Sequence, residues 1–251
     1  MHSLTLAQVA VAVDGVIEGD SQIVVSGVQT DSRAVSPGDL YCAIVGERVD
    51  GHDFIDEALK NGATAVLASR STGHPSVIVP LVDGPLDAVI LALGNLARYQ
   101  RTLMEDVVVI GVTGSSGKTS TKDIIGQVLS SRGTTHAPSG SPNNELGLPL
   151  TLLDAPVDTE FLVAEMGMRG LGHIKYLCDI AAPRIGVVTN VGHAHVGEVG
   201  SVEGIAQAKA ELVRSLPQDG TAILNSDDRL VRNMAQDLAC KIITYGFNSS
   251  A

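Results

Sequence analysis

The chain has 251 residues, of which 44% are hydrophobic, and its formal net charge is -11. This length and apolar content are sufficient for two ordinary domains, each with a packed core. The acidic balance argues against a surface that binds nucleic acid or an anionic membrane, because such surfaces need clustered Lys and Arg. Any phosphate-bearing ligand must therefore be held by a local site.

The cysteines, Cys42, Cys178 and Cys240, are widely spaced and form no CxxC pair. Such usage is typical of buried thiols in a reducing compartment rather than of a disulfide framework. The sequence has no basic segment followed by an apolar run, and no stretch of roughly 18 uninterrupted apolar residues. We therefore predict a cytoplasmic protein that has neither a membrane span nor a nucleic-acid partner. We also expect it to be a monomer.

The first hundred residues predict short helices and strands separated by polar turns. In chain order we expect a helix over 4–13, a β-rich stretch over 22–28, a strand over 40–45, a helix over 53–61, strands over 64–68 and 77–79, and a helix over 86–103. Thr5 is the expected cap of the first helix. The charged pair Glu105-Asp106 marks a predicted boundary between an N-terminal domain, 1–105, and a second domain, 106–251.

After this boundary, strand and helix signals alternate. The predicted strands span 107–112, 134–137, 161–165, 185–189, 221–224 and 241–245, with helical patterns between most of them. This alternation is typical of an α/β fold with a mostly parallel, doubly wound sheet that helices cover on both faces. Ligands of such sheets bind at the carboxyl ends of the strands, so the residues that follow each strand are candidates for the site.

The stretch VVVIGVTGSSGKTSTKD, which starts at Val107, has the features of a phosphate-binding loop. A buried strand leads into a glycine-rich turn, and Lys118 and Thr119 begin a helix. The lysine can reach the outer phosphates and the threonine hydroxyl can hold Mg²⁺. The strict pattern asks for glycine where Val112 stands, and Gly111 comes one residue too early. A chance glycine-rich turn is the alternative, but the strand and helix context favours a nucleoside triphosphate with magnesium.

Polar residues follow other predicted strands. Glu165 ends the third strand of this domain and is a candidate magnesium ligand, the alternatives being a salt bridge or a helix cap. His193 and His195 follow the fourth strand; being two apart, they point to opposite sides of an extended segment, so at most one faces a site there. Lys209, on a predicted helix over 201–216, is by itself expected to be a solvated surface charge.

Two further segments predict helix caps rather than sites. Asn143 or Asn144 is the expected cap in SGSPNNELGLPLTLL, and Asn225-Ser226-Asp227-Asp228 is the expected cap of a helix that runs to Leu238.

Taken together in order and spacing, these motifs resemble one family. GVTGSSGKTSTKD, NNELGLPLTLL, VAEMG, TNVGHAH, GSVEGIAQAKAEL and LNSDD resemble the ATPase domain of the Mur ligases of peptidoglycan precursor synthesis. The preceding TDSRAVSPGDLYCAIVGERVDGHDF resembles the UDP-binding N-terminal domain of the same family. NNELGLPLTLL and EMG favour the branch that joins D-alanyl-D-alanine to UDP-N-acetylmuramoyl-tripeptide, because the branch that adds the third residue typically differs at both places.

The resemblance implies ATP-dependent amide bond formation. In this family ATP phosphorylates the terminal carboxylate of the nucleotide-linked peptide, the incoming amine attacks the acyl phosphate, and ADP and phosphate leave. A carboxylate needs such activation because its oxygen is a poor leaving group, and two anions can meet only where positive charge is concentrated.

The resemblance also implies roles for individual residues. The phosphate-binding residues would be Gly114, Ser115, Ser116, Gly117, Lys118, Thr119 and Ser120. Thr119 and Glu165 would hold the first Mg²⁺, and His195 would be a ligand of the second metal. Lys209 matches a lysine that is often carbamylated, which would turn the cation into an anion able to help hold that metal.

Two more assignments come from the resemblance. Asn144 aligns with an asparagine near the γ-phosphate and the acyl phosphate. Asp31, Ser32 and Arg33 match the DSR motif near the uridine diphosphate, the alternative being a polar turn.

Members of the family are considerably longer, with the remainder of the ATPase domain and a third, C-terminal domain. The resemblance therefore implies the first two domains of a ligase, as a fragment or a truncated gene product. A non-catalytic module that binds nucleotide or the UDP precursor is one alternative, and another amide ligase of the same architecture, such as the folylpolyglutamate type, is a second. The DSR-containing segment argues against the folylpolyglutamate type.

Overall fold

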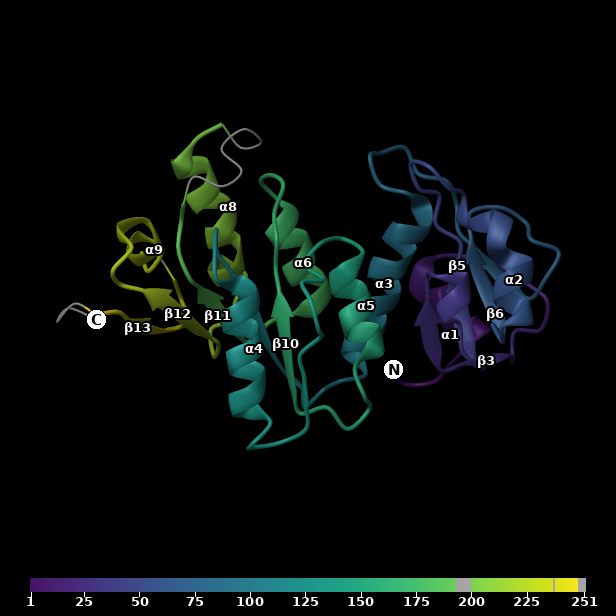
Figure 1. Cartoon of the computed structure of the whole chain (residues 1–251), viewed down its shortest axis with the longest axis horizontal. Coiled ribbons are helices and arrows are strands. Elements are labelled where there is room, and N and C mark those ends of the chain that lie inside the picture. Colours follow the sequence, from purple (N-terminus) through teal and green to yellow (C-terminus); the bar gives the residue numbers. More distant parts are fainter. Residues whose placement is uncertain (193–199, 237, 248–251) are drawn as a thin grey trace. The chain divides into compact units, whose positions relative to one another are not determined.

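A computed structural model describes residues 1–192, 200–236 and 238–247 of the chain (Figure 1). The chain divides into two compact units. The first unit comprises Met1–Leu103 and Leu152–Val157, and the second unit comprises Met104–Thr151 and Asp158–Ala251.

The first unit is built on a five-stranded sheet. Its strands lie in the order β2 (Val16–Glu18), β7 (Ser76–Ile78), β6 (Ala65–Ala68), β5 (Asp39–Cys42) and β4 (Gly27–Gln29). Strands β7 to β4 are parallel, and β2 is antiparallel to β7. A two-stranded ribbon of β1 (Leu4–Thr5) and β3 (Val24–Val25) is also present, with α1 (Leu6–Val13), η1 (Ser32–Ala34), η2 (Gly51–Phe54), α2 (Ile55–Lys60) and α3 (Ala88–Thr102).

Sequence patterns locate most of these elements, but β1 and β2 were not predicted, and the helix expected over 4–13 begins at Leu6. The first helix has Thr5 as its cap: Thr5 Oγ1 accepts from Gln8 N at 3.2 Å, and Gln8 Oε1 accepts from Thr5 N at 2.9 Å. This is a capping box, and it confirms the expected cap. The strand expected to reach residue 45 ends at Cys42, because Val45 turns back and makes only an isolated bridge with Asp50.

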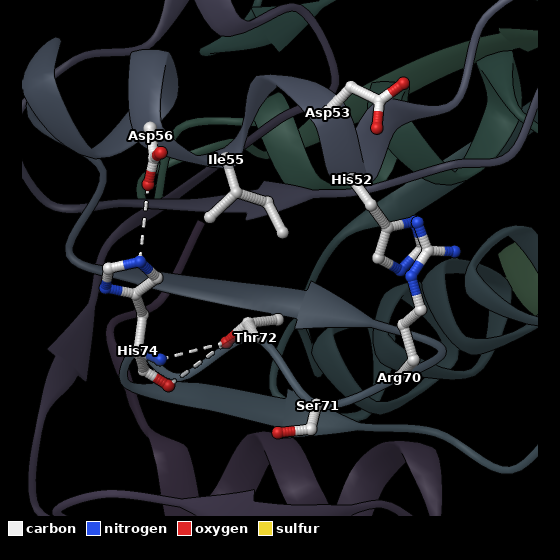
Figure 2. Close-up of a pocket in the computed structure, with 8 residues that line it drawn as sticks. All are labelled: His52, Asp53, Ile55, Asp56, Arg70, Ser71, Thr72 and His74. Atoms are coloured by element: carbon white, nitrogen blue, oxygen red, sulfur yellow. Dashed lines mark hydrogen bonds and ion pairs between the residues drawn. The ribbon is translucent and has the colours of Figure 1, made fainter.

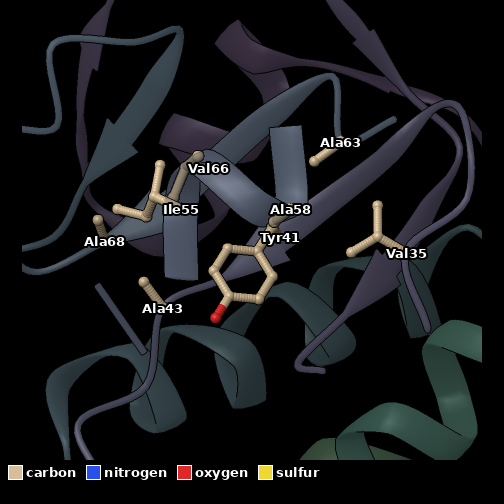
Figure 3. Close-up of a cluster of buried hydrophobic side chains, with 8 residues drawn as sticks. All are labelled: Val35, Tyr41, Ala43, Ile55, Ala58, Ala63, Val66 and Ala68. Carbon is tan, nitrogen blue, oxygen red and sulfur yellow. The ribbon is translucent and has the colours of Figure 1, made fainter. Parts of the chain in front are cut away.

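A buried aromatic ring organises one face of the first sheet. Tyr41 on β5 lies within a cluster of small apolar side chains that α2 helps to close (Figure 3). Besides Tyr41, the cluster consists of Val35, Ala43, Ile55, Ala58, Ala63, Val66 and Ala68. The ring is only 2% exposed, and its hydroxyl donates to the carbonyl of Gly51 at 3.0 Å. This bond fixes the turn that leads into α2.

The second unit contains a six-stranded sheet in which every pair of neighbours is parallel. Its order is β13 (Lys241–Tyr245), β12 (Thr221–Asn225), β11 (Ile185–Val188), β8 (Val108–Thr113), β10 (Phe161–Glu165) and β9 (Thr135–His136). Figure 1 labels β13, β12, β11 and β10 in this sequence across the sheet. The connecting helices include α4 (Lys118–Leu129), α6 (His173–Ala181), α8 (Val202–Arg214) and α9 (Arg229–Asn233). Helix α5 (Gly147–Asp154) belongs to this unit up to Thr151. Strand β8 comes first in sequence but lies in the middle, so the strand order reverses there. That is where ligands of doubly wound sheets bind.

Helices cover both faces of this sheet. Val187 packs with Ile125 and Leu129 of α4, whereas its neighbour Val188 packs with Ala210 and Val213 of α8. Successive residues of a strand point to opposite faces, so α4 and α8 cover opposite faces. The predicted α/β fold with a parallel, doubly wound sheet is confirmed.

The helix expected to run to Leu238 is shorter than predicted. Asp228 is its cap, accepting from Leu230 N at 2.9 Å and Val231 N at 3.2 Å, and α9 ends at Asn233. Beyond that point the backbone bonds join residues three apart, as from Met234 N to Val231 O. Tightened turns of this kind end an α-helix.

The three cysteines are free and buried, as expected. Burial raises the pKa of the Cys42 and Cys178 thiols to about 12, so neither is a reactive thiolate near neutral pH. Among the helices of the described ranges, none is long and apolar enough to cross a bilayer.

Replacing Tyr41 tests the packing of the first unit. Tyr41→Phe removes the bond to Gly51, and we expect the free energy of unfolding to fall by about 1 kcal/mol in urea titrations near neutral pH. Burial raises the pKa of the Tyr41 phenol from 10.0 to about 12. A raised pKa means that this contribution is complete below the unfolded-state pKa and is lost as the pH rises toward 12.

Wild type should therefore lose stability faster than Tyr41→Phe between pH 10 and pH 12. Tyr99→Phe, outside the cluster, should keep the wild-type pH dependence. A parallel decline of wild type and Tyr41→Phe would show that the phenol is not buried as described.

Candidate nucleotide and magnesium site

The glycine-rich loop joins the central strand β8 to α4. Gly114 has φ +155° and Gly117, the cap of α4, has φ +78°, both conformations that favour glycine. Lys118 folds back over the loop, its Nζ donating to the carbonyl of Gly114 at 3.0 Å. The first N–H groups of a helix have no partner within the helix, so the start of α4 and this ammonium offer donors to an anion.

Glu165 lies beside this loop. Strand β10 pairs in parallel with β8, and the pairing sets Glu165 opposite Val112. The residue is 1% exposed. Thr119 Oγ1 donates to Glu165 Oε2 at 2.7 Å, and Ser141 Oγ and Asn143 Nδ2 each donate to Oε1 at 2.7 Å. The structure thus joins the two residues that the sequence proposes as magnesium ligands. Within the described part of the chain, Glu165 forms no salt bridge and caps no helix.

These bonds keep the carboxylate ionised. Burial acts to raise the pKa of Glu165, but the bonds from Asn143, Ser141 and Thr119 and the charge of Lys118 outweigh it. The net effect is a pKa below the ordinary value. The group is therefore an anion at neutral pH.

The donor set fits magnesium. Thr119 and Glu165 supply a hydroxyl and a carboxylate, which are the oxygen ligands that Mg²⁺ prefers. No group of three or more His, Cys, Asp or Glu side chains that could hold a metal occurs in the described part of the chain. A metal carried largely by nucleotide phosphates and water needs only one or two protein oxygens, so this pair is sufficient.

The segment after β11, residues 189–192, is hydrogen-bonded to the phosphate loop; we call these contacts the clasp. Thr189 Oγ1 donates to the carbonyl of Ser116 at 2.8 Å, and the Asn190 amide both donates to that carbonyl, at 3.1 Å, and accepts from Ser116 N at 3.0 Å. On the same segment, Gly192 N donates to Ser115 Oγ at 2.8 Å. The sequence analysis assigned no role to Thr189 or Asn190. Their position directly after a predicted strand is the feature by which they could have been identified as candidates for the site.

The clasp is itself held by the next strand. Asn225, the last residue of β12, donates from Nδ2 to the carbonyl of Thr189 at 2.9 Å. Asp228 Oδ2 accepts from Val191 N at 2.7 Å. The four residues expected only to cap α9 therefore also support the loop, through Asn225 and Asp228.

The two asparagines of NNELG have different positions. Asn144 Oδ1 accepts from Leu146 N at 3.3 Å and from Gly147 N at 2.8 Å, which confirms it as a helix cap at the start of α5. Asn143 instead contacts Glu165, a contact that the sequence did not predict. The contact between Ser141 and Glu165 was not predicted either.

The expectation that Lys209 is a solvated charge is wrong. Its side chain on α8 is 2% exposed, and burial together with the charge of Lys118 lowers its pKa to about 8. Helix α8 can pack closely against strand β8 because residue 111 is a glycine: a Cβ there would lie 2.8 Å from Leu212 Cδ1 of α8. The glycine therefore serves helix packing rather than phosphate binding.

Two other residues are predicted for this site. Ser120 is exposed in the first turn of α4, and His195 lies outside the described residues.

In the first unit, the DSR residues form a capped turn after β4. Asp31 accepts from Arg33 N at 3.0 Å, and the Arg33 guanidinium donates to both Asp31 oxygens, at 2.9 and 2.7 Å. These bonds lower the pKa of Asp31 to about 2. Ser32 is buried and donates to Glu57 Oε2 at 2.6 Å. The polar turn is thus present, and Arg33 remains largely exposed.

A polar pocket of about 240 Å³ lies on the same unit (Figure 2). It is lined by His52, Asp53, Ile55, Asp56, Arg70, Ser71, Thr72 and His74. Arg70, shortly after β6, pairs with Asp50 at 2.8 Å, and Asp50 also accepts from His52 Nδ1 at 2.7 Å. Ser69 N donates to His52 Nε2 at 3.3 Å, so the ring proton is on Nδ1. The pocket carries charges of both signs.

Comparisons with known proteins agree with this geometry. Residues 112–251 match the family profile "Mur ligase middle domain", and residues 24–100 match "Mur ligase family, catalytic domain". The chain is 44% identical to the UDP-N-acetylmuramoyl-tripeptide–D-alanyl-D-alanine ligase of Mycobacterium tuberculosis, over 97% of this chain and 52% of that protein. The chain spans about half the length of the curated relatives it matches.

Two solved structures are also similar to this chain. MurF from Acinetobacter baumannii superposes with a TM-score of 0.87 at 32% identity, over 98% of this chain and 54% of that one. The MurF ligase from Thermotoga maritima in complex with ADP superposes with a TM-score of 0.76 at 36% identity, over 88% of this chain and 50% of that one.

A methyl group at Gly114 tests the clasp. Its Cβ would lie 1.8 Å from Thr189 Oγ1, so Gly114→Ala must displace the loop or the segment after β11. We expect the variant to lose about 1–3 kcal/mol of stability in thermal or urea unfolding. Gly170→Ala is the matched control, because nothing lies within 4 Å of its Cβ. Equal stability of the two variants would contradict the described packing.

Proposed function

This chain belongs to the Mur ligase family, and we propose that it carries the substrate- and ATP-binding parts of a ligase that joins D-alanyl-D-alanine to UDP-N-acetylmuramoyl-tripeptide. In this proposal residues 1–105 bind the UDP precursor and residues 106–251 bind ATP, and the reaction belongs to cytoplasmic peptidoglycan precursor synthesis. The relatives named for this reaction support the choice of substrates.

The observation that carries the proposal is the contact between Thr119 and Glu165 beside the phosphate loop. A threonine hydroxyl at the start of α4 meets an ionised carboxylate at the end of the neighbouring strand, at 2.7 Å. Lys118 lies on the same loop. Together they provide a cation for the outer phosphates and two oxygens for Mg²⁺, which is what ATP binding requires.

The chemistry follows from the charges at this site. Phosphoryl transfer to a carboxylate brings two anions together, so the positive groups lower the barrier chiefly by electrostatic stabilisation. Lys118 would contact the β- and γ-phosphates. Asn144, the cap of α5, would lie near the γ-phosphate, as the family resemblance implies. Bound Mg²⁺, held by Thr119 and Glu165, would neutralise phosphate charge.

Lys209 and His195 complete the proposed site. A pKa of about 8 gives Lys209 a substantial neutral fraction in mildly alkaline solution, the form that reacts with carbon dioxide. A carbamate on Lys209 would be an anion and, with His195, could hold a second metal, as the family resemblance implies.

The DSR residues support the binding of UDP in the first unit. Asp31, Ser32 and Arg33 follow β4, and β4, β5 and β6 run parallel, so this turn lies at the carboxyl edge of the sheet. Arg33 is exposed and can reach a diphosphate. We propose that this edge binds the nucleotide part of the precursor.

Lys118→Ala tests the ATP site. Loss of the ammonium removes the charge that faces the phosphates, and we expect ATP binding, measured by calorimetry with Mg²⁺ present, to be abolished together with any hydrolysis. Lys175→Ala changes an exposed lysine on α6 of the same unit and should bind as wild type does. Unchanged ATP affinity in Lys118→Ala would refute the phosphate loop.

The precursor site is tested by titrating the chain with UDP-N-acetylmuramoyl-tripeptide. We expect selective binding over plain UDP and over an unrelated nucleotide sugar, because the muramoyl peptide adds contacts. Arg33→Ala should weaken this binding while leaving ATP binding intact. Failure of a folded sample to prefer the muramoyl tripeptide would count against the assignment of residues 1–105.

A further inference from the structure

A lysine that the proposed function does not use is completely buried next to the magnesium site. Lys122 is on α4, one turn after Thr119, and is 0% exposed. Its ammonium donates to the carbonyls of Pro138 and Gly140, the latter at 2.9 Å, and lies 3.0 Å from Asp123 Oδ1. The ammonium thus donates two hydrogen bonds to backbone carbonyls and forms an ion pair with a carboxylate.

The carbonyls that Lys122 binds belong to an irregular segment. Residues 138–143, between β9 and α5, form neither helix nor strand, and Gly140 has φ +72°. Such a segment has no backbone ladder to fix its path. It is held at its beginning by Lys122 and at its end by Gly167 N, which donates to the carbonyl of Asn143 at 2.8 Å.

Of the three donors to Glu165 among the described residues, this segment carries two. Ser141 and Asn143 bond to Oε1, and Asn143 Nδ2 also donates to Ser141 Oγ at 2.9 Å. Oε2 is bonded to Thr119 of α4. Helix α4 therefore acts on both oxygens of the carboxylate: directly through Thr119, and indirectly through Lys122 and the segment that it holds.

We propose that Lys122 is a positioning residue for magnesium: by fixing residues 138–140 it places Ser141 and Asn143, which orient the Glu165 carboxylate toward the metal of a bound nucleotide. This inference rests on the proposed function for the identity of the metal and its nucleotide. Residues that orient a metal ligand through hydrogen bonds set its direction and basicity, so losing them weakens metal binding without removing a ligand.

A purely structural role would give a different pattern. Burying an ammonium is unfavourable unless it is fully paired, and apolar side chains of similar volume often replace buried charges at little cost in stability. A lysine needed only for packing should therefore be replaceable by methionine without a specific effect on metal. A lysine that positions Glu165 should not.

The test measures how much Mg²⁺ strengthens ATP binding, as the ratio of Kd without and with the metal. Wild type, Lys122→Met, Lys122→Arg and Ser141→Ala are titrated calorimetrically with ATP in EDTA and in Mg²⁺. We expect Lys122→Met to reduce the magnesium-dependent gain about 10-fold to 100-fold, with the affinity in EDTA within about twofold of wild type. Ser141→Ala should lose gain in the same sense, and Lys122→Arg, which keeps the charge, should recover part of it.

A second readout does not need nucleotide. Amide hydrogen exchange over residues 138–143 should accelerate in Lys122→Met and stay at the wild-type rate in Lys175→Met, a matched change of an exposed lysine. A folded Lys122→Met with the full magnesium-dependent gain overturns the inference and leaves the proposed function standing. If Lys122→Met does not fold, an unreduced gain in Ser141→Ala overturns it equally. A wild type that binds ATP without any help from Mg²⁺ refutes the magnesium site itself, and with it both proposals.

Discussion

The second unit depends on one buried anion. Glu165 is almost inaccessible to water, yet it stays ionised because donors from two separate segments satisfy it. A buried carboxylate without hydrogen-bond donors would be strongly destabilising. The Glu165 side chain at the end of β10 therefore requires both the start of α4 and the segment before α5 to be in place. The same donors leave an oriented carboxylate beside a phosphate loop. Stability and the capacity to bind magnesium therefore arise from the same contacts.

Close approach of the backbone is the second constraint. Gly111 and Gly186 lie side by side on β8 and β11, and side chains at either position would meet Leu212 of α8. Because α8 can approach the sheet, Lys209 comes near enough to Lys118 for the two charges to interact, which adds to the effect of burial on the pKa of Lys209. Lys118 and Lys209 thus lie close together next to the phosphate loop. Hydrogen bonds between the segment after β11 and both Ser115 and Ser116 fix the phosphate loop as well.

Local patterns in the sequence were sufficient for the architecture. Apolar runs located the strands of the second unit and most of those of the first, although β1 and β2 were not predicted. The glycine, lysine and threonine of the loop predicted the phosphate site, together with Glu165 at a strand end. Contacts between distant segments were not predictable in this way. Nothing near Ser141 or Asn143 in the sequence indicates that they meet Glu165, and helical periodicity gives no sign that Lys122 and Lys209 are covered by other segments. The role of Gly111 was unclear for the same reason, since its neighbour in space is on α8.

The central claim is that the Glu165 carboxylate binds the magnesium of a nucleotide held by the phosphate loop. Glu165→Gln tests it most directly, because the amide keeps the size of the side chain and removes its charge. The measurement is the Kd for ATP, determined calorimetrically in EDTA and again with Mg²⁺ present. We predict that Mg²⁺ strengthens ATP binding in wild type and that Glu165→Gln loses most of this gain while binding metal-free ATP about as well as wild type. A Glu165→Gln variant with the full gain would contradict the account.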